Sequence, residues 1–183
     1  MAHRFHPDWI VPSSVHHYLP DNHRLAGCLL GQRLRAVTRL LDVPVEDEPR
    51  LEYGPALLTG HDGEQWLIDT EESKANVLFI SDVTRTLANS LWYSGMTNRV
   101  PMAEPIPGHP LRSLVTEAVT AVEVVSRDPE EGVPDSFAMC GVRLTTTGGT
   151  QICVGTHLTD LMISEVAFRT PAEVGPGLYY APL

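Results

Sequence analysis

Two segments of this sequence, about 85 residues apart, repeat the same order of apolar, polar and small residues. The first covers residues 30–37 (LGQRLRAV) and the second covers residues 115–122 (VTEAVTAV). Three further matches follow in the same order: 58–66 with 144–152, Thr70 with Thr156, and 80–83 with 163–166. Because four landmarks recur in one order at nearly constant spacing, we interpret the chain as an internal duplication whose two copies fold alike.

Composition narrows the class of protein and of partner. A chain of 183 residues suits one domain, or two small halves with a shared core, and 43 % hydrophobic with 20 % charged residues is typical of a soluble globule. The net charge of −10 repels phosphate backbones and anionic lipid headgroups, so we expect neither nucleic acid nor a membrane as partner. No apolar run of about 18 residues and no signal-peptide core occur, and the three cysteines form no C-x-x-C pair. The expected location is the cytoplasm.

The repeat divides the chain into three regions. Residues 1–27 precede the first copy and are expected to form an irregular N-terminal arm. Residues 28–112 hold the first β repeat, a helix and a proline-rich connector. Residues 113–183 hold the second β repeat and a C-terminal tail, 178–183, that is expected to cover an open sheet edge.

Two hairpins are the clearest local structures. Asp62-Gly63 and Gly148-Gly149 each separate two β-type runs, and such pairs suit the positive φ angles of a two-residue type I′ turn. With two-residue turns, Thr59 pairs with Trp66, and Cys140 pairs with His157.

The same register places Cys140 and Cys153 on one face of the sheet, four residues out of step. Their separation is then about 13 Å at roughly 3.3 Å per residue, which is too far for a disulfide. Both are predicted to be free thiols.

The opening segment of each copy is ambiguous between helix and strand. We favour strand, because the second copy is rich in β-branched residues, which suit a pleated sheet. Further strands are predicted at 76–81 and 161–164. A helix is predicted from Ser81 or Asp82 to Gly95, in the first copy only, since Pro171 would break a helix at the matching place. The expected fold class is therefore mainly β: two tandem β repeats share one core, as a sandwich or partly closed barrel, with one short helix after the first repeat.

A seam between the two repeats is the expected place for a pocket. The predicted register lines it with Trp66, Asp69, Glu71, Cys140, His157 and Asp160. A thiol beside an imidazole, with a carboxylate to orient the ring, can act as a nucleophile. If the protein is an enzyme, its catalytic candidates are His157, Cys140, Glu71 and Asp160. The favoured interpretation is simpler, with Cys140 as a small core residue and His157 at a strand end.

The segment after the first repeat is the strongest candidate for recognition. It contains Trp92 and Tyr93, and it is flanked by Arg85 and Arg99. Trp, Tyr and Arg are enriched in the energetically important parts of contact surfaces. These four residues, with Trp66, form the predicted binding set.

No cofactor or metal is predicted. The N-terminal histidines have ligand chemistry, but none forms an H-x-x-x-H or H-E-x-x-H motif on a convincing helix: His3, His6, His16, His17 and His23. Neither a glycine-rich phosphate loop between strand and helix nor a G-x-S-x-G elbow is present.

Three functions remain open. The leading hypothesis is a non-catalytic cytosolic binding protein, for example an antitoxin-like (immunity-type) inhibitor whose carboxylates cover the basic active site of a partner. The alternative is a small pocket enzyme or ligand carrier that acts on a small apolar metabolite by acid/base chemistry at the seam. A third hypothesis is a homodimer that pairs exposed β edges.

Overall fold

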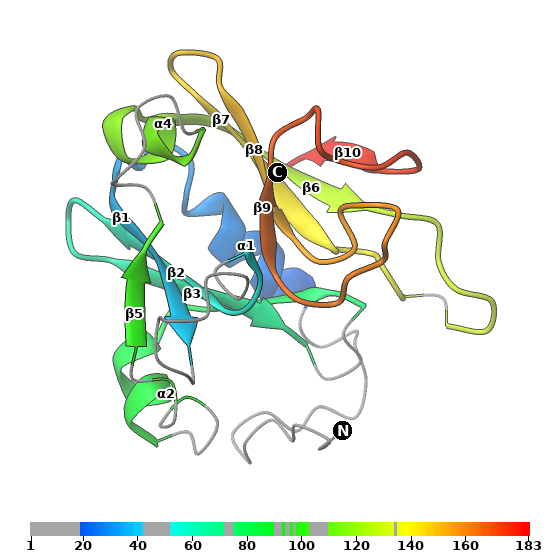
Figure 1. Cartoon of the computed structure of the whole chain (residues 1–183), viewed down its shortest axis with the longest axis horizontal. Helices are drawn as coiled ribbons and strands as arrows, with labels where there is room; N and C mark the ends of the chain where they lie inside the picture. The colour runs from blue at the N-terminus through cyan, green and yellow to red at the C-terminus, as the bar shows by residue number, and fades with distance from the viewer. Residues whose placement is uncertain are drawn as a thin grey trace.

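The protein is built from two five-stranded antiparallel sheets, one from each half of the chain (Figure 1). The computed structural model describes residues 19–41, 52–71, 75–89, 93, 96, 98–102, 110–133 and 135–183. The first sheet, ordered β4-β3-β2-β1-β5, contains β1 (Leu34–Leu41), β2 (Ala56–Gly60), β3 (Gln65–Thr70), β4 (Val77–Ile80) and β5 (Asn98–Pro101). The second, ordered β10-β6-β7-β8-β9, contains β6 (Val119–Ser126), β7 (Gly141–Thr146), β8 (Gln151–Gly155), β9 (Ala167–Arg169) and β10 (Tyr179–Pro182). The predicted mainly β class is confirmed.

The two sheets match in detail as well as in strand order. In each, four strands form a meander, and a fifth returns to the free side of the first strand. Strands β1 and β6 have nearly the same order of buried and exposed residues, and both shift register at the same place, between Leu34 and Ala36 and between Val119 and Ala121. Both opening segments therefore contain a strand, as the β-branched content of the second copy predicted, although Val115 and Thr116 lie in a short helix before β6.

The main core lies between the sheets. It includes Leu34, Val37, Trp66, Ile68 and Phe79 from the first half, and Val122, Val142, Leu144, Val154 and Phe168 from the second. Burying a side chain of this size contributes about 1.5–3 kcal/mol, so this shared interior is the largest source of stability. Main-chain contacts also join the sheets, with a bridge between Arg33 and Ala118 and another between Tyr53 and Ala167.

One charged side chain lies inside this core. Arg39 of β1 has no exposed surface, and its guanidinium donates to the carbonyl oxygens of Gly54, Val166 (3.1 Å) and Glu52 (3.2 Å). The matching residue of the second half is Val124, which is also in the core. Burial lowers the pKa of Arg39 from 12.5 to about 9.

Both hairpins have three-residue turns, so the predicted register is wrong by one residue. Gly60 N donates to Glu64 O and Thr146 N donates to Thr150 O, and Gly63 and Gly149 have φ angles of 90° and 82°. Glycine thus takes the third, left-handed position of a turn with a bulge, where other residues are strained. Leu58, and not Thr59, pairs with Trp66.

The last strand of the second meander also differs from prediction. Residues 161–164 were expected to pair as a strand, but β9 forms three residues beyond them, at Ala167–Arg169. The connection from β8 to β9 has eleven residues, whereas that from β3 to β4 has six. The apolar residues of 161–163 therefore lie in a loop and do not enter the sheet.

The helices lie beside the sheets: α1 (Leu19–Gly27), α2 (Val83–Asn89) and α4 (Leu111–Thr116). Helix α1 falls within the arm that was expected to be irregular. It is held there by Asn22, whose buried side-chain amide donates to Val77 O (2.7 Å) and accepts from Phe79 N (2.8 Å) on the edge strand β4. Helix α2 confirms the helix after the first repeat, and no helix follows β9, as Pro171 predicted.

A proline sits at the same place in each returning strand. Met102 N donates to Val37 O, and Leu183 N donates to Val122 O. Since successive residues of a strand point their amides to opposite sides, the preceding residues, Pro101 and Pro182, face the outer edge. A residue without an N–H at an edge weakens pairing with another chain. The predicted role of the C-terminal tail is confirmed, because β10 covers the side of β6.

The described residues meet neither the requirements of a membrane-spanning helix nor those of a metal site. None of the helices in the described part of the chain is long and apolar enough to cross a membrane. Among the same residues, no three His, Cys, Asp or Glu side chains are grouped so that they could hold a metal ion. The histidines of residues 1–18 lie outside the described residues.

Candidate functional site

The residues of the predicted seam pocket lie in different environments. Trp66 is in the main core, and Asp69 points to the outer face of the first sheet, where its carboxylate accepts a hydrogen bond from Tyr93. Glu71 is buried, and its carboxylate accepts a hydrogen bond from the backbone N–H of Asn76 at 3.3 Å. Asp160 is exposed.

The predicted nucleophile is not activated. Cys140 is fully buried, and its thiol donates to the carbonyl oxygen of Val125 at 3.3 Å. Burial raises the pKa of this thiol from 9.0 to about 12, so it stays protonated at neutral pH. It packs with Cys153 and Leu158 in a small cluster apart from the main core, which contains Val142. Cys140 and Cys153 are free, as predicted, and so is Cys28.

The ring and the backbone N–H of His157 contact neighbouring loop residues. In the structure Cys140 lies opposite Thr156, whose backbone N–H donates to the carbonyl oxygen of Cys140 at 2.7 Å. The predicted partner, His157, is the next residue along the chain. The His157 ring meets Phe137 edge-on, with 4.9 Å between ring centroids, and its backbone N–H donates to Ile163 O.

Of the predicted recognition residues, the three whose side chains the structure describes do not share one surface. Tyr93 and Trp66 are each only 2 % exposed, which removes both rings from contact with a partner. Arg85 is exposed and pairs with Asp82 at 3.1 Å. Arg99 belongs to β5, but its side chain lies outside the described residues, as does the whole of Trp92.

Two loops at one end of the second sheet make the surface that we call the loop face. They are the β6–β7 loop (127–140) and the β8–β9 loop (156–166), and the first projects from the body of the molecule (Figure 1). Arg127 joins them, because its guanidinium donates to the carbonyl oxygens of His157 (2.6 Å) and Thr159 (3.4 Å) while its own N–H donates to Phe137 O (3.1 Å).

Both loops have defined backbone conformations. In the β6–β7 loop, Ser136 Oγ accepts from Glu130 N (2.6 Å) and donates to Val133 O (2.8 Å). Within the described parts of the chain, the non-glycine residues with positive φ are Phe137 (58°), His157 (51°) and Met162 (51°), and all of them belong to the loop face. Such conformations persist only where surrounding contacts hold them.

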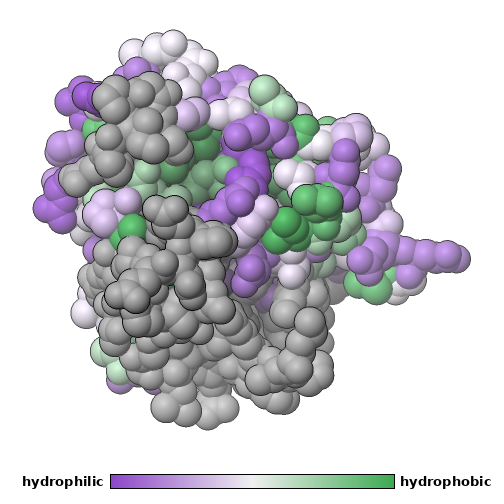
Figure 2. Space-filling view, in the orientation of Figure 1, coloured by the Kyte–Doolittle hydropathy of each residue, from purple (hydrophilic) through white to green (hydrophobic). Residues whose placement is uncertain are grey.

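Apolar side chains are exposed on the loop face. Leu161 is 78 % exposed and Met162 is 42 % exposed, and Val133 of the neighbouring loop is 45 % exposed. Figure 2 shows hydrophobic surface over the β8–β9 loop, beside the hydrophilic projection of the β6–β7 loop. Leu161 is the most exposed large hydrophobic residue in the described part of the chain.

Carboxylates outnumber basic side chains in the two loops. The two loops carry one arginine, Arg127, and six carboxylates: Asp128, Glu130, Glu131, Asp135, Asp160 and Glu165. The arginine is bound to carbonyl groups of its own chain, as described above. The loop face therefore combines exposed apolar side chains with an excess of carboxylates.

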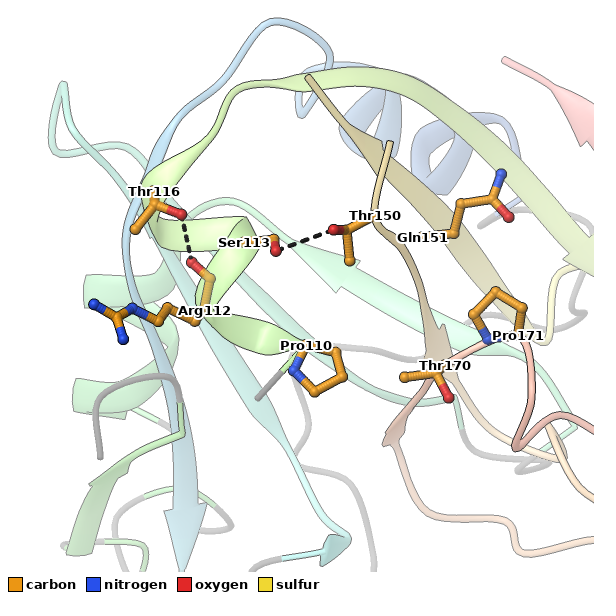
Figure 3. Close-up of a pocket in the computed structure, with 8 residues that line it drawn as sticks. All are labelled: Pro110, Arg112, Ser113, Thr116, Thr150, Gln151, Thr170 and Pro171. Carbon is orange, nitrogen blue, oxygen red and sulfur yellow. Dashed lines mark hydrogen bonds between the residues drawn. The ribbon is translucent and has the colours of Figure 1, made fainter. Parts of the chain in front are cut away.

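A second feature is a pair of related hollows, one in each half. In the second half, α4, the start of β8 and the end of β9 enclose a hollow of about 420 Å³, across which Ser113 Oγ donates to Thr150 Oγ1 at 3.1 Å (Figure 3). Arg112 also lines it, although its guanidinium points away from Ser113 and Thr150. The hollow of the first half, about 390 Å³, lies at the matching place, with Cys28, Gln65 and Ser81 where the second has Ser113, Gln151 and Thr170.

The lining of the second hollow suits hydrogen bonding to a small polar molecule. Its hydroxyl groups are already partly engaged: Thr116 donates to Arg112 O, and Thr170 donates to Glu173. No carboxylate, imidazole or thiol lines this hollow, so its lining offers no general base of the ordinary kinds.

No protein-family model, no curated protein and no solved structure matches this chain.

Sequence reasoning missed the loop face because it assigned residues 161–164 to a buried strand. The available signal was the shortness of the apolar run. Leu161-Met162-Ile163 is only three residues long and is enclosed by Asp160 and Ser164-Glu165. Polar residues this close on both sides are typical of a loop.

Proposed function

We propose that this chain is a non-catalytic binding protein that contacts a partner protein through the loop face. The observation that carries the proposal is the exposure of Leu161 (78 %) and Met162 (42 %) next to each other. Exposed apolar side chains that gather in one place, with polar residues at the border, are typical of protein interaction sites.

The difference between the two halves supports this role. Both halves build the same meander, but the loop that carries Leu161 is five residues longer than its counterpart in the first half. The longer loop is therefore not needed to form a sheet of this kind. Residues on loops that a rigid scaffold positions are the usual carriers of binding function.

A concrete form of this function is an antitoxin-like inhibitor. The carboxylates of the loop face would lie against the basic active site of the partner, and Leu161 would enter an apolar recess there. Charge of opposite sign would also speed the encounter of the two proteins. The environment of Cys140 supports a binding protein over an enzyme with a thiol nucleophile. Its thiol donates to a carbonyl group, and burial raises its pKa so that it stays protonated.

Site-specific photo-crosslinking in the producing organism tests the proposal. A photo-reactive amino acid at Val133 should give a discrete adduct with one protein, while the same group at Leu30, which is 54 % exposed in the turn near the start of β6, should give none. Leu161→Ser should abolish the Val133 adduct, and Leu30→Ser should leave it unchanged. Equal labelling from both positions, or none at Val133, would contradict the proposal.

A second candidate function is transport or sensing of a small polar ligand in the hollow beside α4. It is favoured by the presence of a hollow at the matching place in each half. A set of polar metabolites should raise the melting temperature of the protein, and Thr150→Trp, which fills the hollow, should remove that rise. If no metabolite has an effect, this function is excluded for the compounds in the set.

A further inference from the structure

We infer that the partner is a protein with a basic cleft that binds phosphate groups, and that the loop face occupies this cleft and blocks it. The inference rests on the proposed function and names the chemistry of its partner.

The shape of the loop face calls for a concave partner. The β6–β7 loop stands out from the body of the molecule (Figure 1), and Figure 2 shows it as a projection. Leu161, on the adjoining loop, has more than three quarters of its surface exposed. A projecting loop and a projecting side chain make few contacts with a flat surface, but they fill a cleft that has a recess in it.

The charge of the loop face selects the kind of cleft. The two loops contain six carboxylates and one arginine, and that arginine donates to carbonyl groups within the loop face itself. A cleft lined by lysine and arginine is complementary to such a surface, and clefts of this composition are what proteins use to bind phosphate groups. The carboxylates would then take the places of phosphates.

The apolar centre explains how such a contact becomes specific. Carboxylates alone attract any basic surface, and that attraction is screened by salt. Leu161 and Met162 add contact area that only a matching recess can cover. The expected complex therefore depends on both features, and loss of either should weaken it.

Competition with a polyanion during photo-crosslinking tests the inference. The Val133 adduct is formed in lysate with inorganic polyphosphate, or with uncharged dextran of similar size. Polyphosphate should lower the yield of the adduct about tenfold or more, because it competes for the same cationic groups, and dextran should not change it. An adduct that polyphosphate leaves intact overturns the inference while the proposed function stands. Absence of any adduct at Val133 overturns both.

Charge variants provide the second measurement. Glu130→Gln with Glu131→Gln removes two carboxylates from the loop face without altering the backbone groups that hold the loop. We expect this pair to lower the adduct yield about tenfold, and the control pair Asp21→Asn with Glu64→Gln, which removes two carboxylates from the first half, to leave it unchanged. Equal effects of the two pairs would show that net charge alone acts, and would overturn the inference.

Discussion

The hydroxyl of Tyr93 donates a 2.8 Å hydrogen bond to Oδ2 of Asp69, and both side chains are buried. Asp69 stands on β3, and Tyr93 comes from the segment that follows α2, so the bond ties that segment to the outer face of the first sheet. Around it lies an apolar cluster of Leu40, Leu57, Leu67, Leu78, Ile80, Val83 and Met96. This polar contact therefore lies inside the apolar covering of that face and helps to hold it in place.

Replacing Tyr93 by phenylalanine should destabilise the protein. The change leaves a buried carboxylate without this donor, which costs about 1–3 kcal/mol of unfolding free energy. Urea denaturation measures the loss. Tyr179→Phe is the matched control, because its hydroxyl also donates to a carboxylate, that of Asp128, but on the surface. Its effect should stay within about 0.5 kcal/mol, and equal losses in the two variants would contradict the prediction.

Buried thiols should make the stability depend on pH in the alkaline range. Burial raises the pKa of Cys140 from 9.0 to about 12 and that of Cys153 from 9.0 to about 11. Because both pKa values are higher in the folded state, their contribution is complete below pH about 9 and is lost as the pH rises towards 11 to 12. The unfolding free energy should therefore fall from pH 9 upwards. In Cys140→Ala with Cys153→Ala the slope between pH 9 and 10 should be smaller. An unchanged slope would show that the thiols do not cause it.

Substitution of Arg39 tests whether a buried guanidinium stabilises the junction of the two sheets. Arg39→Val copies the residue of the second half, Val124, and leaves the carbonyl groups of Gly54, Val166 and Glu52 without this donor. Unsatisfied buried groups of this kind cost about 1–3 kcal/mol each, so we expect a loss of at least about 2 kcal/mol in chemical denaturation. A more stable variant would show that the cost of burying the charge exceeds the gain from its hydrogen bonds.

The prolines at the sheet edges should limit self-association. Pro182→Val restores an N–H group that faces outward from β10, and a free edge with a continuous row of donors pairs readily with another strand. The variant should form larger species at high concentration, as measured by light scattering. Ala181→Val, one residue earlier, adds a β-branched residue without a new outward donor and is the control. Larger species in the control alone would contradict this explanation.

The internal repeat accounts for most of what could be predicted about the fold. Apolar periodicity and the Gly63 and Gly149 turns were sufficient to predict two similar β units, because strand formation and tight turns depend on neighbouring residues. The hairpin register was wrong by one residue, since both glycines take the third position of a three-residue turn and not the second of a two-residue turn. Sequence spacing does not distinguish these two turns, although each sets a different pairing for the whole hairpin.

The candidate site was harder to predict because its residues are placed by contacts between distant segments. Arg127 gave no signal in the sequence, yet it holds the β6–β7 loop against the carbonyl groups of residues 157 and 159. Leu161 belongs to a short apolar run that resembles a strand. It is exposed because β9 forms further along the chain and leaves this run in a loop.

The amino-acid sequence alone determined that the chain forms two like β units, an acidic surface and free thiols, because periodicity, turn residues and charge are local properties. The tertiary structure decided which apolar residues remain in contact with water. That choice depends on strand register and loop length across the whole sheet. Because β9 begins six residues later than the predicted strand, an expected core segment became the exposed centre of the loop face.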